Sequence, residues 1–270
     1  MVDTNQDNEG LAWQIEVWNR ISQTYVSEID RRFRSVTGSV IDRAALLVGE
    51  SVLDLGTGTG AVAEQAAVAV GPSGRVIALD ISPEMLAIAR QRFTGLELGN
   101  ATVREGRAES IPVDDDTIDC VLASLSMMYV IDRATAAREI ARTLKPGGRF
   151  LASVWAGPEE CDIVLFQQTA GRFAGPPPVA GVGPAALADA REFLGELEAA
   201  GIHAHVEKQE LGFDFEDFAS AWDALAGVTT AHLSADQQQE AKDAVMAAMY
   251  PDGDGPRHFR NVTQFIVGRA

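Results

Sequence analysis

The stretch VLDLGTGTG, residues 52–60, decides the fold of this chain. Its first half is an apolar run typical of a buried strand, and glycines follow at positions 56, 58 and 60 before a helical pattern that starts at Ala61. Glycines in such a turn let the backbone reverse tightly and leave room for a ligand to lie against it. The stretch therefore predicts a strand, a ligand-binding turn and a helix.

Strands and helices alternate on both sides of this turn. Ser82-Pro83-Glu84 is typical of a helix start, and Pro146-Gly147-Gly148 of a helix end. Alternation of this kind predicts a doubly wound α/β fold with a mostly parallel sheet and right-handed crossovers. Strands are expected at 51–55, 75–80, 101–105, 117–125 and 149–155, with helices from residue 61, over 83–93 and over 134–144.

One domain is expected over residues 11–270. Apolar residues recur every four positions from Trp13 to Ile29, which predicts N-terminal helices within 11–48. The cofactor-binding core is expected at 49–155, and lid elements at 156–187 and 213–250, including the proline- and glycine-rich loop Gly175–Gly183. Residues 1–10 are polar and are expected to form a disordered tail.

Composition excludes several classes of function. A formal charge of −17 opposes contact with nucleic acid, and the basic run Arg31–Arg34 is interpreted as a solvated helix face. No long apolar run or secretory signal is present, so we expect a cytoplasmic protein without a membrane partner. Cys120 and Cys161 are isolated, which argues against a disulfide framework or a metal site.

Two carboxylates indicate the ligand of the turn. Asp54 beside the glycines would oppose an anionic pyrophosphate but favour a ligand bearing an ammonium group and a sulfonium. Asp80 ends the next strand, where a carboxylate can accept both hydroxyls of a ribose. Together they indicate an adenosine-bearing ligand, although Gly56-x-Gly58-x-x-Ala61 is also compatible with a dinucleotide.

Four motifs in this order resemble those of class I S-adenosylmethionine-dependent methyltransferases, in particular the ubiquinone-biosynthesis-like, type 11 group that acts on small molecules. They are VLDLGTGTG, ALDISPEML (78–86), EGRAESIPVDDDTIDCVLASLSMMYVID (105–132) and RTLKPGGRF (142–150). The resemblance covers residues 45–155 and is only architectural beyond them. It implies a Rossmann-like sheet of seven strands, the last antiparallel, under a helical lid, with S-adenosylmethionine as the cofactor.

The resemblance also implies roles for individual residues. Asp54 and the glycine loop would hold the methionine portion, Asp80 the ribose, and Ile81 and Met85 the adenine, whose edge would meet residues 107–109. The cofactor-binding residues implied in this way are Tyr25, Asp54, Gly56, Thr57, Gly58, Gly60, Asp80, Ile81, Met85, Arg107, Ala108, Glu109 and Ser124.

Two positions depart from the family pattern. Arg107 stands where many relatives carry a carboxylate that accepts from the adenine amino group. Met128 and Tyr129 replace a histidine pair, so a family base is absent and no catalytic residue is assigned. Trp18, Met128, Tyr129 and Trp155 are the expected pocket for a small apolar or aromatic metabolite, such as a secondary metabolite, methylated at O, N or C.

Two other functions stay open at this point. A protein of the same fold could bind the cofactor but catalyse another reaction or regulate a partner. An NAD(P)-dependent oxidoreductase would use the same turn and Asp80 but would give Asp54 no role. Helices outside a doubly wound sheet could also pair two chains into a homodimer.

Overall fold

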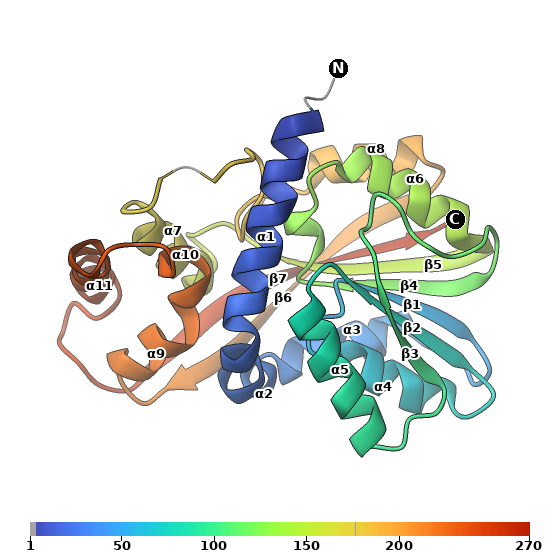
Figure 1. Ribbon diagram of the computed structural model, residues 1–270, viewed down its shortest axis with the longest axis horizontal. Helices are drawn as coiled ribbons and strands as arrows, with labels where there is room; N and C mark the ends of the chain where they lie inside the picture. Colours follow the sequence, from blue (N-terminus) through green and yellow to red (C-terminus); the bar gives the residue numbers. More distant parts are fainter. Residues whose placement is uncertain (1–3, 176) are drawn as a thin grey trace.

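The computed structural model describes residues 4–175 and 177–270, and its centre is a seven-stranded sheet in the order β3-β2-β1-β4-β5-β7-β6 (Figure 1). All neighbouring strands pair in parallel except those at β7, which is antiparallel to both β5 and β6. The expected doubly wound sheet with an antiparallel last strand is confirmed. Its strands are β1 Ser51–Leu55, β2 Arg75–Asp80, β3 Ala101–Glu105, β4 Ile118–Ser124, β5 Leu144–Trp155, β6 His203–Phe215 and β7 Arg257–Arg269.

Helices cover both faces of the sheet because successive side chains of each strand point to opposite faces. In β1, Val52 belongs to one buried cluster and Leu53 to the other. The first cluster packs against α3 Arg34–Ala44, α4 Ala61–Val70 and α5 Pro83–Gly95, and the second against α6 Arg133–Thr143 and α8 Arg191–Ala199. Near-continuous apolar strands are expected in a sheet that is buried on both sides.

The helix starts follow from local chemistry. Ser82 Oγ accepts a hydrogen bond from Met85 N, and Pro83 occupies the first turn of α5, as the sequence predicts. Asp132 caps α6 in the same way through Thr135 N. These caps fix where each helix leaves the carboxyl edge of the sheet.

The N-terminal region crosses that edge. Helix α1, Thr4–Thr24, continues through the π-helical turn η1, Tyr25–Ile29, into the short α2, Asp30–Arg32, and then α3 (Figure 1). The expected disordered tail is therefore wrong from Thr4 onward, and residues 1–3 lie outside the described part.

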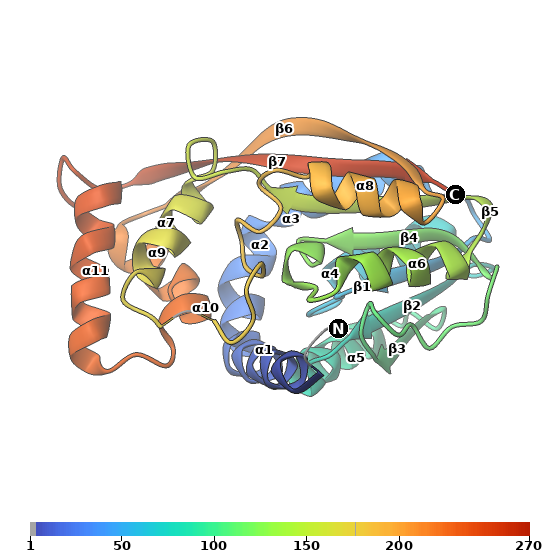
Figure 2. The ribbon, with the colours of Figure 1, turned by 90° about the horizontal axis from the view of Figure 1, so that it is seen from above.

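A helical cap lies beyond the sheet, where β6 and β7 extend past the other strands (Figures 1 and 2). It consists of α7 Asp162–Gly171, α9 Phe218–Leu225, α10 Gly227–Thr230 and α11 Ala235–Met249. Part of the loop Gly175–Gly183 falls outside the described residues, but Gly183 N donates to Met128 O at 3.0 Å. In the part of the chain that the structure describes, no helix combines the length and apolarity that spanning a bilayer would need.

Candidate active site

The glycine turn after β1 forms the floor of a cleft at the carboxyl edge of the sheet. Gly56 and Gly58 have φ of +67° and +54°, a region that favours glycine. A Cβ at Gly56 would lie 2.5 Å from Ser126 Cβ, whereas a Cβ at Gly58 would meet no atom within 4 Å. The first glycine is thus required by packing, and the second leaves open space for a ligand.

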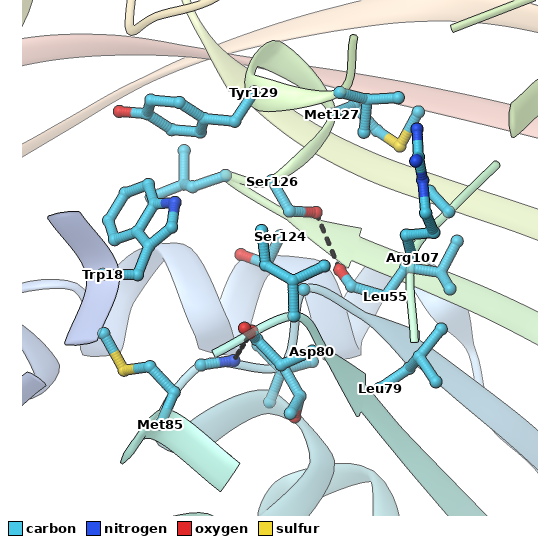
Figure 3. Close-up of a pocket in the computed structure, with 18 of the residues that line it drawn as sticks. Trp18, Leu55, Leu79, Asp80, Met85, Arg107, Ser124, Ser126, Met127 and Tyr129 are labelled. Atoms are coloured by element: carbon cyan, nitrogen blue, oxygen red, sulfur yellow. Dashed lines mark hydrogen bonds between the residues drawn. The ribbon is translucent and has the colours of Figure 1, made fainter. Parts of the chain in front are cut away.

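Asp80 is held over this turn at the end of β2. One carboxylate oxygen accepts from Gly58 N at 2.8 Å (Figure 3), and the other accepts from Ser82 N at 2.9 Å. Burial raises the pKa of Asp80, although these backbone hydrogen bonds oppose the shift. A carboxylate has about four acceptor positions, so Asp80 can still receive two hydroxyl groups from the cleft.

Asp54 lies behind the loop and does not line the cleft. It is 1% exposed and accepts from Thr57 Oγ1 at 2.6 Å. Burial raises the pKa of Asp54 to about 7, Thr57 opposes this shift, and the nearby charge of Asp80 adds to it. Any effect of Asp54 on a ligand therefore acts through the loop and through its charge.

The other expected cofactor residues surround the cleft, apart from Gly60, which packs on Phe93. Figure 3 shows Trp18, Met85 and Tyr129 on one side, Arg107 and Met127 on the other, and Asp80 between them. Arg107 Nε donates to Glu109 Oε2 at 3.1 Å. The expected residues that line the cleft are Tyr25, Gly56, Thr57, Gly58, Asp80, Ile81, Met85, Arg107, Ala108, Glu109 and Ser124, together with Trp18 and Tyr129.

The segment after β4 closes the cleft from above. Leu125 has φ of +53°, which costs a branched residue roughly 1–2 kcal/mol. Its backbone N–H is fixed by Ser153, through the carbonyl at 2.8 Å and the hydroxyl at 3.1 Å, and Ser126 Oγ donates to Leu55 O at 2.7 Å. Strain of this kind persists where the surrounding structure holds it, often at ligand sites.

Sequence reasoning missed Asp30, which also lines the cleft. It accepts from Thr59 Oγ1 at 2.8 Å and forms an ion pair with Arg92. These contacts tie the N-terminal helices to the glycine loop and to α5. No local pattern marks Asp30, because its partners are distant in the sequence.

A second cavity, which we call the apolar chamber, adjoins the cleft beneath the helical cap. The two share a wall of Trp18, Tyr25, Phe33, Leu125 and Tyr129, and the chamber continues over Met128, Trp155, Ile163, Gln167, Leu225 and Val228. Thus Met128 and Trp155, expected in the acceptor pocket, line the chamber but not the cleft.

Charged groups are absent from the described residues that line the apolar chamber. Burial raises the pKa of both Tyr25 and Tyr129, so their hydroxyls stay protonated. Gln167 is engaged with Leu225 O and Thr229 Oγ1. The four histidines, His203, His205, His232 and His258, line neither cavity, so no histidine is placed to act as a base.

Comparison with known proteins agrees with this geometry. Residues 53–152 match the family model described as a methyltransferase domain. The chain is 34% identical to the ubiquinone/menaquinone biosynthesis C-methyltransferase UbiE of Pasteurella multocida over 149 residues. The aligned stretch covers 55% of this chain and 53% of the relative. The chain thus spans about half the length of the curated relatives it matches.

Solved structures share the fold over a larger part of the chain. A putative methyltransferase from Bacillus halodurans has a TM-score of 0.64 at 23% identity, covering 87% of this chain and 98% of its own. The [4+2]-cyclase SpnF has a TM-score of 0.56 at 21% identity, covering 89% of this chain and 80% of its own. Residues 53–152 therefore match a methyltransferase domain, and most of the chain shares the fold of a putative methyltransferase.

Proposed function

We propose that this protein transfers a methyl group from S-adenosylmethionine to a small, uncharged, apolar or aromatic acceptor. The proposal rests on one juxtaposition: a cleft with an open glycine turn and a carboxylate that can accept further hydrogen bonds adjoins a chamber without charged side chains. The family match to a methyltransferase domain supports the cofactor. The UbiE relative is named as a C-methyltransferase of ubiquinone and menaquinone biosynthesis, so quinone-related aromatic carbon nucleophiles are the first acceptors to test.

The residues present fit the cofactor. Asp80 would accept from the ribose hydroxyls, and the open face at Gly58 would lie against the methionine portion. Ile81 and Met85 would pack on the adenine, with residues 107–109 at its edge. Asp54 would add negative charge beneath the ammonium group.

When bound, the cofactor supplies an already activated methyl group, so the protein's main task is orientation and exclusion of water. The shared wall, including Trp18, Leu125 and Tyr129, would hold the acceptor in line with that methyl group. Tyr25 and Tyr129 would donate hydrogen bonds, because their raised pKa values prevent them from acting as bases. The acceptor atom would therefore be an electron-rich carbon or a neutral amine nitrogen.

Filling the apolar chamber should separate acceptor binding from cofactor binding. Val228 is half-buried and lines only the chamber, so we expect Val228→Phe to abolish most methyl transfer while the affinity for S-adenosylhomocysteine stays unchanged. The control is Val68→Phe, because Val68 is 69% exposed on α4 and lines neither cavity. Release of S-adenosylhomocysteine with a panel of acceptors measures methyl transfer, and calorimetry measures the affinity for S-adenosylhomocysteine. Full transfer activity in Val228→Phe would place the acceptor elsewhere.

A second function is a different reaction on the same fold. The similarity to the [4+2]-cyclase SpnF shows that this fold is also found in a protein described by another activity. In that case acceptors would be converted without release of S-adenosylhomocysteine. Simultaneous measurement of acceptor conversion and S-adenosylhomocysteine release separates the two functions.

A further inference from the structure

Gln14 presents an unsatisfied polar group to the cofactor cleft. Its side chain is 4% exposed and lines the cleft from α1, and its amide nitrogen Nε2 is buried without a hydrogen-bond partner. An amide buried in this way loses its hydrogen bonds to water and gains none in return. Such a group is expected to find its partner when a ligand enters.

The neighbours of Gln14 along α1 show which part of the cleft it faces. Residues four apart lie on one face of a helix. One turn earlier, a Cβ at Gly10 would lie 3.5 Å from Ile131 Cδ1; one turn later, the ring of Trp18 meets that of Tyr129 edge-to-face at 4.8 Å. Gln14 therefore faces the segment from Tyr129 to Ile131.

This segment adjoins the adenine end of the proposed cofactor site. Asp132 N donates to Glu109 Oε1 at 3.4 Å, which joins the segment to residues 107–109. On the other side, Ser82 Oγ donates to Asn19 Oδ1 at 2.7 Å, which places α1 beside Ile81. The stretch of α1 that carries Gln14 thus bridges the two sides of the place assigned to adenine.

The chemistry of adenine matches a carboxamide. Its edge offers an amino group that donates next to a ring nitrogen that accepts, and glutamine can bind both at once. Arg107 can only donate, so its guanidinium cannot accept from the amino group. Glu109 is already engaged by Arg107 and by Asp132 N.

We propose that Gln14 recognises the adenine of the cofactor, with Oε1 accepting from the amino group and Nε2 donating to a ring nitrogen. This inference rests on the proposed function, because it takes S-adenosylmethionine as the ligand of the cleft. It assigns adenine specificity to the N-terminal helix, outside the methyltransferase domain at residues 53–152.

The test compares two ligands that differ at the adenine amino group. S-inosylhomocysteine carries an oxygen in its place, so it presents an acceptor where adenine presents a donor. By calorimetry, the unmodified protein should prefer S-adenosylhomocysteine by roughly tenfold or more. Gln14→Met, which keeps the side-chain volume, should bind S-adenosylhomocysteine roughly tenfold more weakly and lose most of this preference.

Two measurements keep the inference separate from folding and from the proposed function. Without ligand, Gln14→Met should melt at the same temperature as the unmodified protein or higher, because it removes an unsatisfied donor. Gln239→Met, on an exposed face of α11, is the matched control and should leave both affinities unchanged. Unchanged affinities and preference in Gln14→Met would overturn the inference while the proposed function stood. Absence of S-adenosylhomocysteine binding in the unmodified protein would overturn both.

Discussion

Asp80→Ala should lower the affinity for S-adenosylhomocysteine by roughly 100-fold to 10,000-fold, because two charge-assisted hydrogen bonds are each worth about 1.5–3 kcal/mol. The carboxylate of Asp80 is held by Gly58 N and Ser82 N, with acceptor capacity left toward the cleft. Calorimetric titration measures the loss directly.

Loss of these two backbone contacts will also destabilise Asp80→Ala, so the affinity needs a matched control. Asp119→Ala removes a carboxylate that accepts from Ser51 N at 2.8 Å and pairs with Lys145 at 2.7 Å, away from the cleft. We expect the control to lose stability and keep its affinity. Equal losses of affinity in both variants would contradict a direct role for Asp80.

Asp54→Asn should stabilise the ligand-free protein above pH 7 by roughly 1–3 kcal/mol. The pKa of Asp54 is about 7 in the folded protein and 3.8 as an unperturbed group. Between these two pH values the folded state binds more protons than the unfolded state, so the free energy of unfolding falls as pH rises. Above about pH 7 the full cost of the buried charge is present. Denaturant unfolding from pH 4 to 8 should show a flatter profile in the variant.

The same substitution should weaken binding of the cationic cofactor. Ionised Asp54 favours the sulfonium and ammonium groups, so in the unmodified protein the affinity should fall by about tenfold or less as pH drops from 8 to 5.5. Binding below pH 7 should release protons, which calorimetry in buffers of different ionisation enthalpy detects. A pH-independent affinity in the unmodified protein would show that Asp54 does not act on the ligand.

Local sequence patterns predicted the sheet and the floor of the cleft. The glycine turn, the cap at Ser82 and the position of Asp80 depend on neighbours in sequence, and each has a strong local pattern. The place of Asp54 was harder to predict, because strand alternation puts its side chain on the same face as Val52, away from the cleft.

The roof of the site could not be predicted, because long-range contacts build it. Asp30 meets Thr59 and Arg92, and Gln14 is defined as a cleft residue only by the way α1 crosses the sheet. The local sequence also did not predict a helix at residues 4–10, because that stretch is polar and acidic and has no apolar stripe. The division of the pocket into cleft and chamber depends on aromatic packing between segments far apart in the chain.

Titration of the unmodified protein with S-adenosylmethionine, S-adenosylhomocysteine and NADH tests the central claim most directly. The account predicts that both sulfur ligands bind with one site per chain and that NADH does not, because a pyrophosphate on the glycine turn would lie near the negative charge of Asp54. Binding of NADH without binding of either sulfur ligand would contradict it and would favour a dinucleotide-dependent enzyme.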